Sequence, residues 1–129
     1  MRIKLIFDEK EEVLAELFDT DCAKAIYNIL PIEANLNTWG DEFYFSIPLE
    51  YPLDETATLK VKAGDIGYWP PGKAMAIFFG PTPASVDENP VPASEVNIIG
   101  RLLEDPSKLK KFKKFKKIKI VFKSIFGNG

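Results

Sequence analysis

Hydrophobic and polar residues alternate at the start of the chain. Residues 2–7 (RIKLIF) and 12–18 (EVLAELF) place apolar side chains at every second position, which is the period of a strand with one buried face. Four charged residues, 8–11, stand between the two runs. The pattern predicts an antiparallel hairpin with a four-residue loop.

The hydrophobic period then lengthens. Apolar side chains recur every three to four positions from Cys22 to Leu30, and Asp19 or Thr20 can cap a helix just before them. Pro31 cannot continue a helix because it lacks the backbone N–H. We therefore predict a helix over residues 21–30.

Short apolar segments separated by glycine and proline make up most of the remaining chain. The predicted strands are 34–39, 42–47, 57–62, 65–69, 74–79, 95–102 and 118–122. Residues 70–92 hold six of the ten prolines, which favours ordered but irregular structure over a helix. Asp105 can cap a short helix that opens with Pro106. So many short strands are typical of a barrel or a sandwich.

Composition excludes several kinds of site. The 129 residues contain no histidine and no glutamine, so triads built on histidine and an imidazole pH switch are excluded. The single cysteine, Cys22, cannot form an intramolecular disulfide or a structural Cys-type zinc site. We expect no metal and no cofactor. Few sulfur-containing residues and many Lys and Glu resemble the composition of heat-adapted proteins.

Length and hydropathy bear on domain organisation and location. The chain is about one domain long, and we expect residues 1–129 to form it, with the last few after Phe126 disordered. No apolar run reaches the roughly 18 residues of a membrane helix, and the amino terminus lacks the apolar core of a signal peptide. A cytoplasmic location is the resulting expectation.

Charge is divided unevenly along the chain. Residues 1–106 contain 8 basic and all 19 acidic side chains, a net charge of −11, whereas residues 107–129 contain nine lysines and no acid. The lysines of residues 108–123 are interleaved with Phe, a pattern that can bind nucleic acid or an anionic membrane. The alternative is that they pair with the acidic remainder, while the apolar residues between them complete the fold with a short helix and a last strand.

Four motifs resemble a known family. They are residues 37–45 (NTWGDEFYF), 64–74 (GDIGYWPPGKA), 78–83 (FFGPTP) and 93–101 (ASEVNIIGR). They are similar to a prokaryotic cyclophilin-like family of unknown function, and the similarity extends over nearly the whole chain. The resemblance implies a mainly β protein: a closed or nearly closed cyclophilin-like β-barrel with one or two short covering helices.

The resemblance does not extend to the cyclophilin reaction. Cyclophilin isomerases share an arginine that lies in an aromatic groove near Phe, Gln and His. This chain has neither His nor Gln, and its only arginines are Arg2 and Arg101. We therefore expect the shape of a cyclophilin without prolyl isomerase activity.

The candidate ligand site combines aromatic and polar side chains of these motifs. Alternation places Glu42 and Tyr44 on one strand face, and Asn97 and Arg101, four residues apart, should also share a face. The predicted ligand-binding residues are Trp39, Glu42, Tyr44, Tyr68, Trp69, Phe79, Thr82, Asn97 and Arg101. Each also has a purely structural interpretation in packing, turns or ion pairs. Asp65 is expected to satisfy turn amides and Asp41 to face solvent.

Three functions stay open from the sequence. The favoured one is a non-catalytic module that binds a small ligand or an extended peptide in an aromatic-lined pocket of the barrel. The second is an enzyme, either a degenerate prolyl isomerase or a histidine-free catalyst that uses Glu42, Asp65 and Arg101. The third is attachment to nucleic acid or membrane through residues 108–123. The ligand and the oligomeric state are not determined by the sequence.

Overall fold

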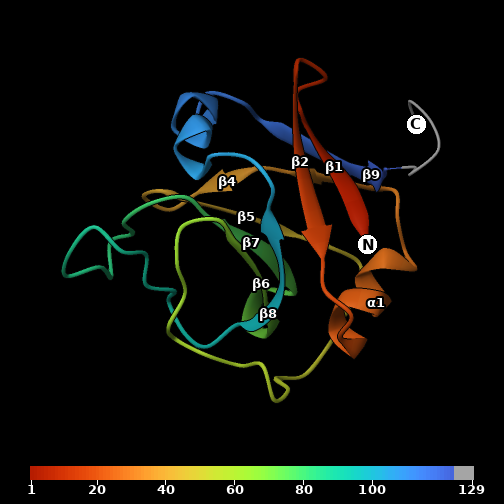
Figure 1. Ribbon diagram of the computed structural model, residues 1–129, viewed down its shortest axis with the longest axis horizontal. Coiled ribbons are helices and arrows are strands. Elements are labelled where there is room, and N and C mark those ends of the chain that lie inside the picture. Colours follow the sequence, from red (N-terminus) through yellow and green to blue (C-terminus); the bar gives the residue numbers. More distant parts are fainter. Residues whose placement is uncertain (124–129) are drawn as a thin grey trace.

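The computed structural model describes residues 1–123, which fold into a nearly closed β-barrel (Figure 1). The strands are β1 (Arg2–Phe7), β2 (Glu11–Leu17), β3 (Ile32–Asn35), β4 (Asn37–Thr38), β5 (Glu42–Ser46), β6 (Asp65–Trp69), β7 (Ala74–Phe78), β8 (Asn97–Leu102) and β9 (Lys117–Phe122). The helices are α1 (Asp21–Tyr27) and two 3-10 helices, η1 (Pro70–Gly72) and η2 (Pro106–Phe112). The fold class predicted from the sequence is confirmed.

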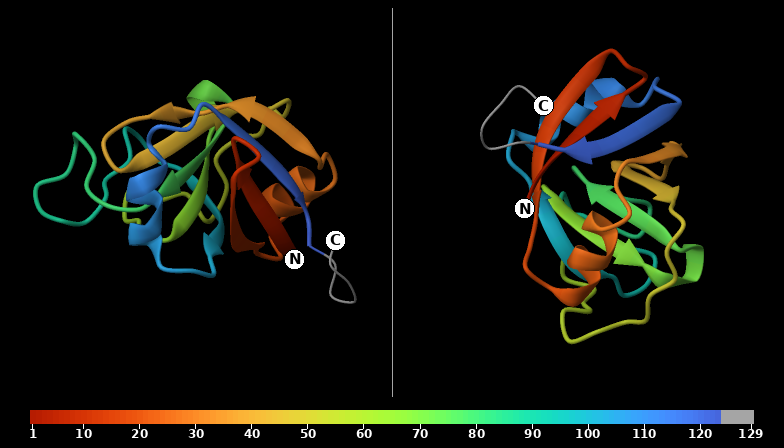
Figure 2. Two further views of the ribbon diagram at one scale, coloured as in Figure 1. Left: turned by 90° about the horizontal axis from the view of Figure 1, so that it is seen from above. Right: turned by 90° about the vertical axis from the view of Figure 1, so that its right-hand side faces the viewer.

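The strands of residues 1–123 form one antiparallel sheet in the order β3-β9-β1-β2-β8-β6-β7-β5-β4. The sheet curls until β3, at one edge, contacts β5 near the other edge. As a result β1, β2 and β9 lie on one side of the barrel and β5, β6 and β7 on the other (Figure 2). The short helix α1 packs against β2 and β8.

The opening hairpin is confirmed, with a loop one residue shorter than predicted. Phe7 pairs with Glu11, so only residues 8–10 connect the strands. Asp8 and Glu9 have φ angles of 50° and 59°, a region that non-glycine residues rarely adopt. The Asp8 carboxylate accepts hydrogen bonds from the backbone N–H groups of Lys116 (3.0 Å) and Lys117 (2.8 Å). These bonds hold the turn against the start of β9.

The predicted helix is present but ends earlier than expected. Thr20 is the N-cap and accepts a hydrogen bond from the backbone N–H of Ala23 at 3.2 Å. The helix ends at Tyr27 rather than at Leu30. Cys22, Ala23 and Ile26 form its buried face, which covers the barrel interior.

The barrel interior is built from every second residue of each strand, the ones whose side chains point inward. Its aromatic centre includes Phe7, Phe43 and Phe79, with ring centroids 5.7 Å apart for Phe7 and Phe43 and 4.7 Å apart for Phe43 and Phe79. Branched aliphatic residues of β1, β2, α1 and β9 pack around them. This interior has no exposure to solvent at most positions.

The strand predicted at residues 57–62 does not form. Thr58 makes a single bridge to Val96, with N–H···O distances of 3.0 and 3.1 Å in the two directions. The neighbouring strand β8 already pairs with β2 on one edge and β6 on the other. β2 reaches only Gly100–Leu102 of β8, and the segment meets the sheet at the Thr58–Val96 bridge alone. Val61 instead packs its side chain into an apolar cluster with Ala76, Phe78 and Val96.

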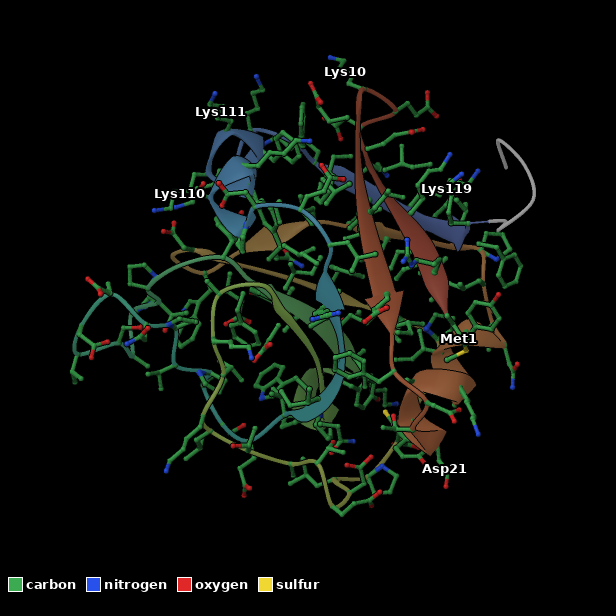
Figure 3. All side chains as sticks on the ribbon, in the orientation of Figure 1. Met1, Lys10, Asp21, Lys110, Lys111 and Lys119 are labelled. Atoms are coloured by element: carbon green, nitrogen blue, oxygen red, sulfur yellow. The ribbon has the colours of Figure 1, made fainter. Side chains whose placement is uncertain are left out.

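The lysine-rich segment is an integral part of the barrel. Its buried apolar residues, Leu109, Phe112, Phe115 and Ile118, recur at every third position, which matches the three-residue turn of a 3-10 helix rather than the period of an α-helix. Phe112 and Phe115 pack on Phe7 at centroid distances of 5.1 and 6.4 Å. The lysines between them point outward, as Lys110 and Lys111 do in Figure 3.

Several of these lysines pair with the acidic remainder of the chain. Lys113 lies 2.5 Å and Lys110 3.8 Å from the Asp41 carboxylate. Lys108 pairs with Glu104 at 2.6 Å. Asp41 is thus largely buried by basic side chains, and the expectation that it faces solvent is wrong. Some lysines of the basic segment therefore neutralise acidic side chains of residues 1–106 by direct contact in the fold.

We predict that the stability of the fold depends on the aromatic residues of this segment and not on its exposed lysines. Phe112→Ala should lower the free energy of unfolding by about 3–5 kcal/mol, because it leaves a cavity beside Phe7. Lys111→Ala, one position away and exposed, should change it by less than about 0.5 kcal/mol. Urea denaturation measures both. Similar effects for the two variants would contradict an integral role for the segment.

Candidate functional site

The outer face of the sheet β5-β7-β6-β8 is also apolar. A second cluster of buried residues, Val61, Ala76, Phe78 and Val96, lies there, with Tyr44, Trp69 and Ile98 packed against it. These side chains belong to the strand positions that alternate with the barrel interior. Loop residues 52–64 and 80–96 cover this face, so the sheet is buried on both sides over these four strands.

Small residues create a hollow on this outer face. Tyr44, Ala76, Gly67 and Ile98 form one row across the four strands. The two central members are small, and a Cβ atom on Gly67 would lie 2.9 Å from the side chain of Val96. Val96 therefore rests directly on the strand backbone. The larger side chains at the two ends of the row, Tyr44 and Ile98, and Trp69 on the next row stand above this low centre.

The hollow is an aromatic pocket of about 210 Å³. Its walls are Trp39, Glu42, Tyr44, Trp69, Pro92, Ala93 and Val96. Trp39 comes from the turn between β4 and β5, Glu42 and Tyr44 from β5, and Trp69 from the end of β6. We call it the outer-face pocket. It is largely apolar, with one carboxyl group in its wall.

Glu42 is the unusual member of the outer-face pocket. The residue is only 7% exposed, and its Oε1 atom is buried without a hydrogen-bond partner among residues 1–123. Burial raises the pKa of the Glu42 carboxyl from its ordinary 4.5 to about 7, and no charged group contributes to the shift. A carboxyl group in this state is poised between its neutral and ionised forms near neutral pH.

The position of Glu42 is fixed by the turn before it. Gly40 has a φ of 61°, and a Cβ there would meet Pro83 and Thr82 at 2.9 Å. The backbone of Asp41 bonds to Pro81 and Phe79 at 2.8 and 2.9 Å. The turn is thereby clamped to residues 79–83, and its glycine is required for this close approach.

The loop that forms the far wall of the pocket is also anchored. The indole N–H of Trp69 donates to Ser94 Oγ at 2.7 Å, which holds residues 92–96 over the pocket. Thr82 Oγ1 donates to the carbonyl of Val91 at 2.5 Å, and Ser85 Oγ donates to the carbonyl of Asn89 at 2.7 Å. The proline-rich loop is therefore braced by its own hydroxyl groups.

Four of the nine predicted ligand-binding residues meet at this pocket: Trp39, Glu42, Tyr44 and Trp69. The pocket lies on the outer face of the barrel wall, not inside the barrel. Tyr68 and Phe79 point the other way into the interior, and the Tyr68 hydroxyl donates to the carbonyl of Leu49 at 2.5 Å. Thr82 is buried in the loop brace described above.

Asn97 and Arg101 do not share a face, so that expectation is wrong. Ile66 pairs with Gly100 and Gly67 with Ile98, which leaves Ile99 as an extra residue in β8. Such a bulge inverts the alternation beyond it. Asn97 is fully buried and bonds to the backbone of Asp54 (2.8 Å) and Pro52 (2.9 Å).

Arg101 lies on the opposite side of its strand and pairs with Glu16 at 2.9 Å. Asp65 is its neighbour on β6, but the Asp65 carboxylate accepts the backbone N–H of Lys62 at 2.9 Å. This is the turn role expected for Asp65. Neither residue lines the outer-face pocket, so Glu42, Asp65 and Arg101 do not form a common site.

Pro92, Ala93 and Val96 were not among the predicted site residues. The signal that could have revealed them is the apolar character of both faces of residues 95–102, where Val96 and Ile98 alternate with Ile99. A strand that is apolar on both faces needs a cover on each. The segment that precedes it along the chain is the nearest candidate for that cover.

The family of this barrel follows from a comparison with protein families. The model of a family described as cyclophilin-like matches residues 1–121. The chain belongs to the cyclophilin-like family. A search of proteins with curated functions found no significant match.

Two solved structures share the fold of this cyclophilin-like chain. A hypothetical protein from Archaeoglobus fulgidus is 36% identical, with a TM-score of 0.78, over 94% of this chain and 93% of that chain. The second is the protein McbB, solved in complex with tryptophan, at 16% identity and a TM-score of 0.69. That match covers 95% of this chain but 45% of McbB, so the likeness to McbB shows the fold alone.

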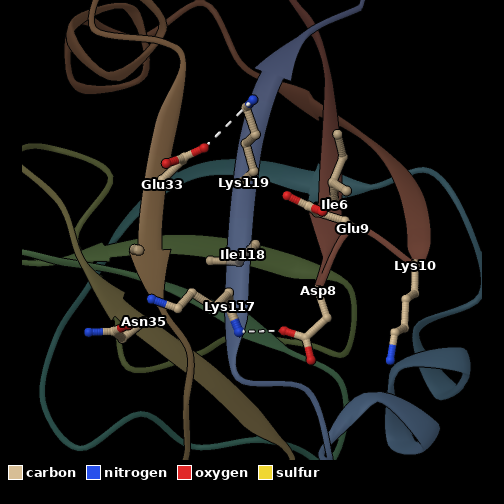
Figure 4. A pocket seen from close by; sticks show the side chains of 10 residues that line it. Ile6, Asp8, Glu9, Lys10, Glu33, Asn35, Lys117, Ile118 and Lys119 are labelled. Carbon is tan, nitrogen blue, oxygen red and sulfur yellow. Dashed lines mark hydrogen bonds and ion pairs between the residues drawn. The ribbon is translucent and has the colours of Figure 1, made fainter.

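A second and wider hollow of about 580 Å³ lies over β1, β3 and β9 (Figure 4). Its lining is mostly charged, and three of the charged side chains are engaged: Glu33 pairs with Lys119 at 3.6 Å, and Asp8 holds the backbone of Lys117. Among residues 1–123, the only buried side-chain oxygen or nitrogen without a partner is in Glu42. The outer-face pocket is therefore the better candidate site.

Two kinds of feature are absent from the described residues, 1–123. No group of three or more Cys, Asp or Glu side chains among them is placed to hold a metal ion. None of their helices is both long and apolar enough to cross a membrane.

We predict that Glu42→Gln stabilises the protein at high pH. The raised pKa means that the folded state binds the proton more tightly than the unfolded chain, so this contribution to stability is complete below pH 4.5 and is lost as pH rises through about 7. The difference in unfolding free energy between Glu42→Gln and the wild type should therefore grow by roughly 3 kcal/mol across that range.

Urea denaturation of both proteins over this pH range measures the difference. Glu95→Gln is the matched control, because Glu95 carries the same charge close to the pocket but is exposed. The difference in unfolding free energy between Glu95→Gln and the wild type should stay nearly constant with pH. A flat difference for Glu42→Gln as well would contradict the burial of an unpaired carboxyl group.

Proposed function

We propose that this protein binds a small organic ligand in the outer-face pocket. The observation that carries the proposal is the buried Oε1 atom of Glu42, which has no partner among residues 1–123 and stands in the wall of a hollow. A buried polar atom without a hydrogen bond costs about 1–3 kcal/mol. A ligand donor placed in the hollow would remove that cost.

The lining of the pocket is typical of small-molecule sites. Such sites are mostly apolar and aromatic, with few polar groups that orient the ligand. Trp39, Tyr44 and Trp69 supply the aromatic walls and Glu42 the polar group. The hydroxyl of Tyr44 and the indole N–H of Trp39 have no hydrogen-bond partner within the described chain, so both are available to a ligand.

The size of the pocket favours a compact ligand over an extended peptide. Its volume of about 210 Å³ is below the roughly 300–1,000 Å³ of sites for drug-sized molecules. Pro92 and Ala93 close one side, whereas an extended peptide needs a groove that is open along its length. Because McbB binds tryptophan and has the same barrel fold, tryptophan is one reasonable probe among many.

We predict that filling the pocket from its mouth abolishes ligand binding. Ala93 is exposed and lines the pocket, so Ala93→Phe should occupy the hollow without disturbing the core. Ala84→Phe, on the same loop but away from the pocket, is the matched control. The measurement is a small-molecule screen, including tryptophan, by NMR of the Trp39 and Trp69 indole N–H signals.

Ligands that shift these signals in the wild type and in Ala84→Phe should have no effect on Ala93→Phe. A broad library that shifts neither indole signal in the wild type would refute the proposed function. Ligands that bind Ala93→Phe as well as the wild type would place the binding site elsewhere.

We also predict no prolyl isomerase activity. Catalysis of the twisted amide requires a donor placed in an apolar groove, but Arg101 is exposed and paired with Glu16 and Arg2 belongs to β1 on the other side of the barrel. The rate of cis/trans exchange in a proline peptide should equal the uncatalysed rate at high protein concentration. A rate that rises with protein concentration and is lost in Ala93→Phe would contradict this.

A further inference from the structure

The charge of Glu42 suggests the chemical class of the ligand. We propose, on the basis of the proposed function, that the outer-face pocket recognises a small organic cation whose positive nitrogen meets the Glu42 carboxylate and whose apolar body lies against Trp39, Tyr44 and Trp69. The inference goes beyond ligand binding as such, because it predicts which ligands are selected and how binding depends on pH.

The first argument is that the protein supplies no positive partner for Glu42. No Lys or Arg lines the pocket. Lys110 and Lys113 bind Asp41, the residue before Glu42, and no charge lowers the pKa of Glu42. An ionised carboxylate in an apolar site is strongly unfavourable without a counter-charge. Within the described residues that counter-charge is lacking, so a proton or a ligand cation must provide it.

The second argument is the aromatic lining. The faces of Trp and Tyr rings carry partial negative charge and attract organic cations, and three such rings line the same pocket as Glu42. The Trp69 ring is held in place by its hydrogen bond to Ser94. A carboxylate combined with aromatic walls favours a cation and disfavours an anion, which would meet the like charge of Glu42.

The third argument concerns protonation. The groups that face Glu42 are Tyr44 on its own strand, Trp39 from the turn, Trp69 from β6, Phe78 opposite it on β7, and the loop residues Pro92, Ala93 and Val96. Of these only Tyr44 has an ionisable side chain, and none is a Lys, Arg, Asp or Glu. The carboxyl group of Glu42 is therefore the one acidic group of the pocket lining. A cation that binds its carboxylate displaces one proton.

The test compares charged and neutral probes of similar shape by isothermal titration calorimetry. The probes are benzylamine, which is cationic at neutral pH, benzyltrimethylammonium, whose charge is permanent, and benzyl alcohol, which is neutral. The proteins are the wild type, Glu42→Gln and the control Glu95→Gln. The cation-to-neutral comparison and the pH profile use the wild type alone, so they do not depend on the folding of a variant.

We expect both cations to bind the wild type at least about tenfold more tightly than benzyl alcohol. Below the Glu42 pKa of about 7, their affinity should rise about tenfold per pH unit and then level off, since one proton is released per ligand. Glu42→Gln should remove both the preference for the cations over benzyl alcohol and the pH dependence. Glu95→Gln should retain both.

Two results would overturn the inference. If benzyl alcohol binds as tightly as the cations, or the affinity for benzyltrimethylammonium does not change with pH, cation recognition fails while small-molecule binding by the pocket stands. If neither these probes nor any member of the broad library shifts the Trp39 and Trp69 signals, the inference and the proposed function fail together.

Discussion

The arrangement of this protein depends on burial of one half of its barrel wall from both sides. In β5, β6, β7 and β8 the inward residues join the barrel interior, and the outward residues form a second apolar cluster. An apolar outer face cannot be left in water without a cost of roughly 25 cal/mol per Å². The long connections before β6 and before β8 provide the cover, and the pocket is the place where that cover is incomplete.

The sequence predicted most of the strands, because their alternation is strong and their ends carry glycine or proline. Prediction from the sequence failed where a structural feature has no signature in the neighbouring residues. The bulge at Ile99 puts Asn97 and Arg101 on opposite faces of the strand, and no residue in 95–102 predicts a bulge. The three-residue period of Leu109, Phe112 and Phe115 is present in the sequence, but it matches a 3-10 helix and not the more common α-helix.

Only part of the candidate site could be predicted from the sequence. Alternation correctly gave Glu42 and Tyr44 a common face, and the motif with Trp69 was recognised as a feature at the end of a strand. Which aromatic residues face outward could not be determined, because both faces of these strands are apolar. Tyr68 and Phe79 were included for their chemistry, and the structure places them in the interior. Pairing of Arg101 with Glu16 depends on contact between β2 and β8, which are 85 residues apart at this point.

Burial of Glu42 without a partner is a stability cost that ligand binding would remove under the proposed function. No Lys or Arg lines its pocket, and Asp41, the residue before it, holds both Lys110 and Lys113. A Gln or a hydrophobic residue at this position would pack against the same rings without the penalty of a buried charge. Groups with strongly shifted pKa values in a cleft concentrate at functional sites. Because Glu42 lines an open hollow, a partner for its carboxyl group can enter from solution, which is the basis of the proposed function.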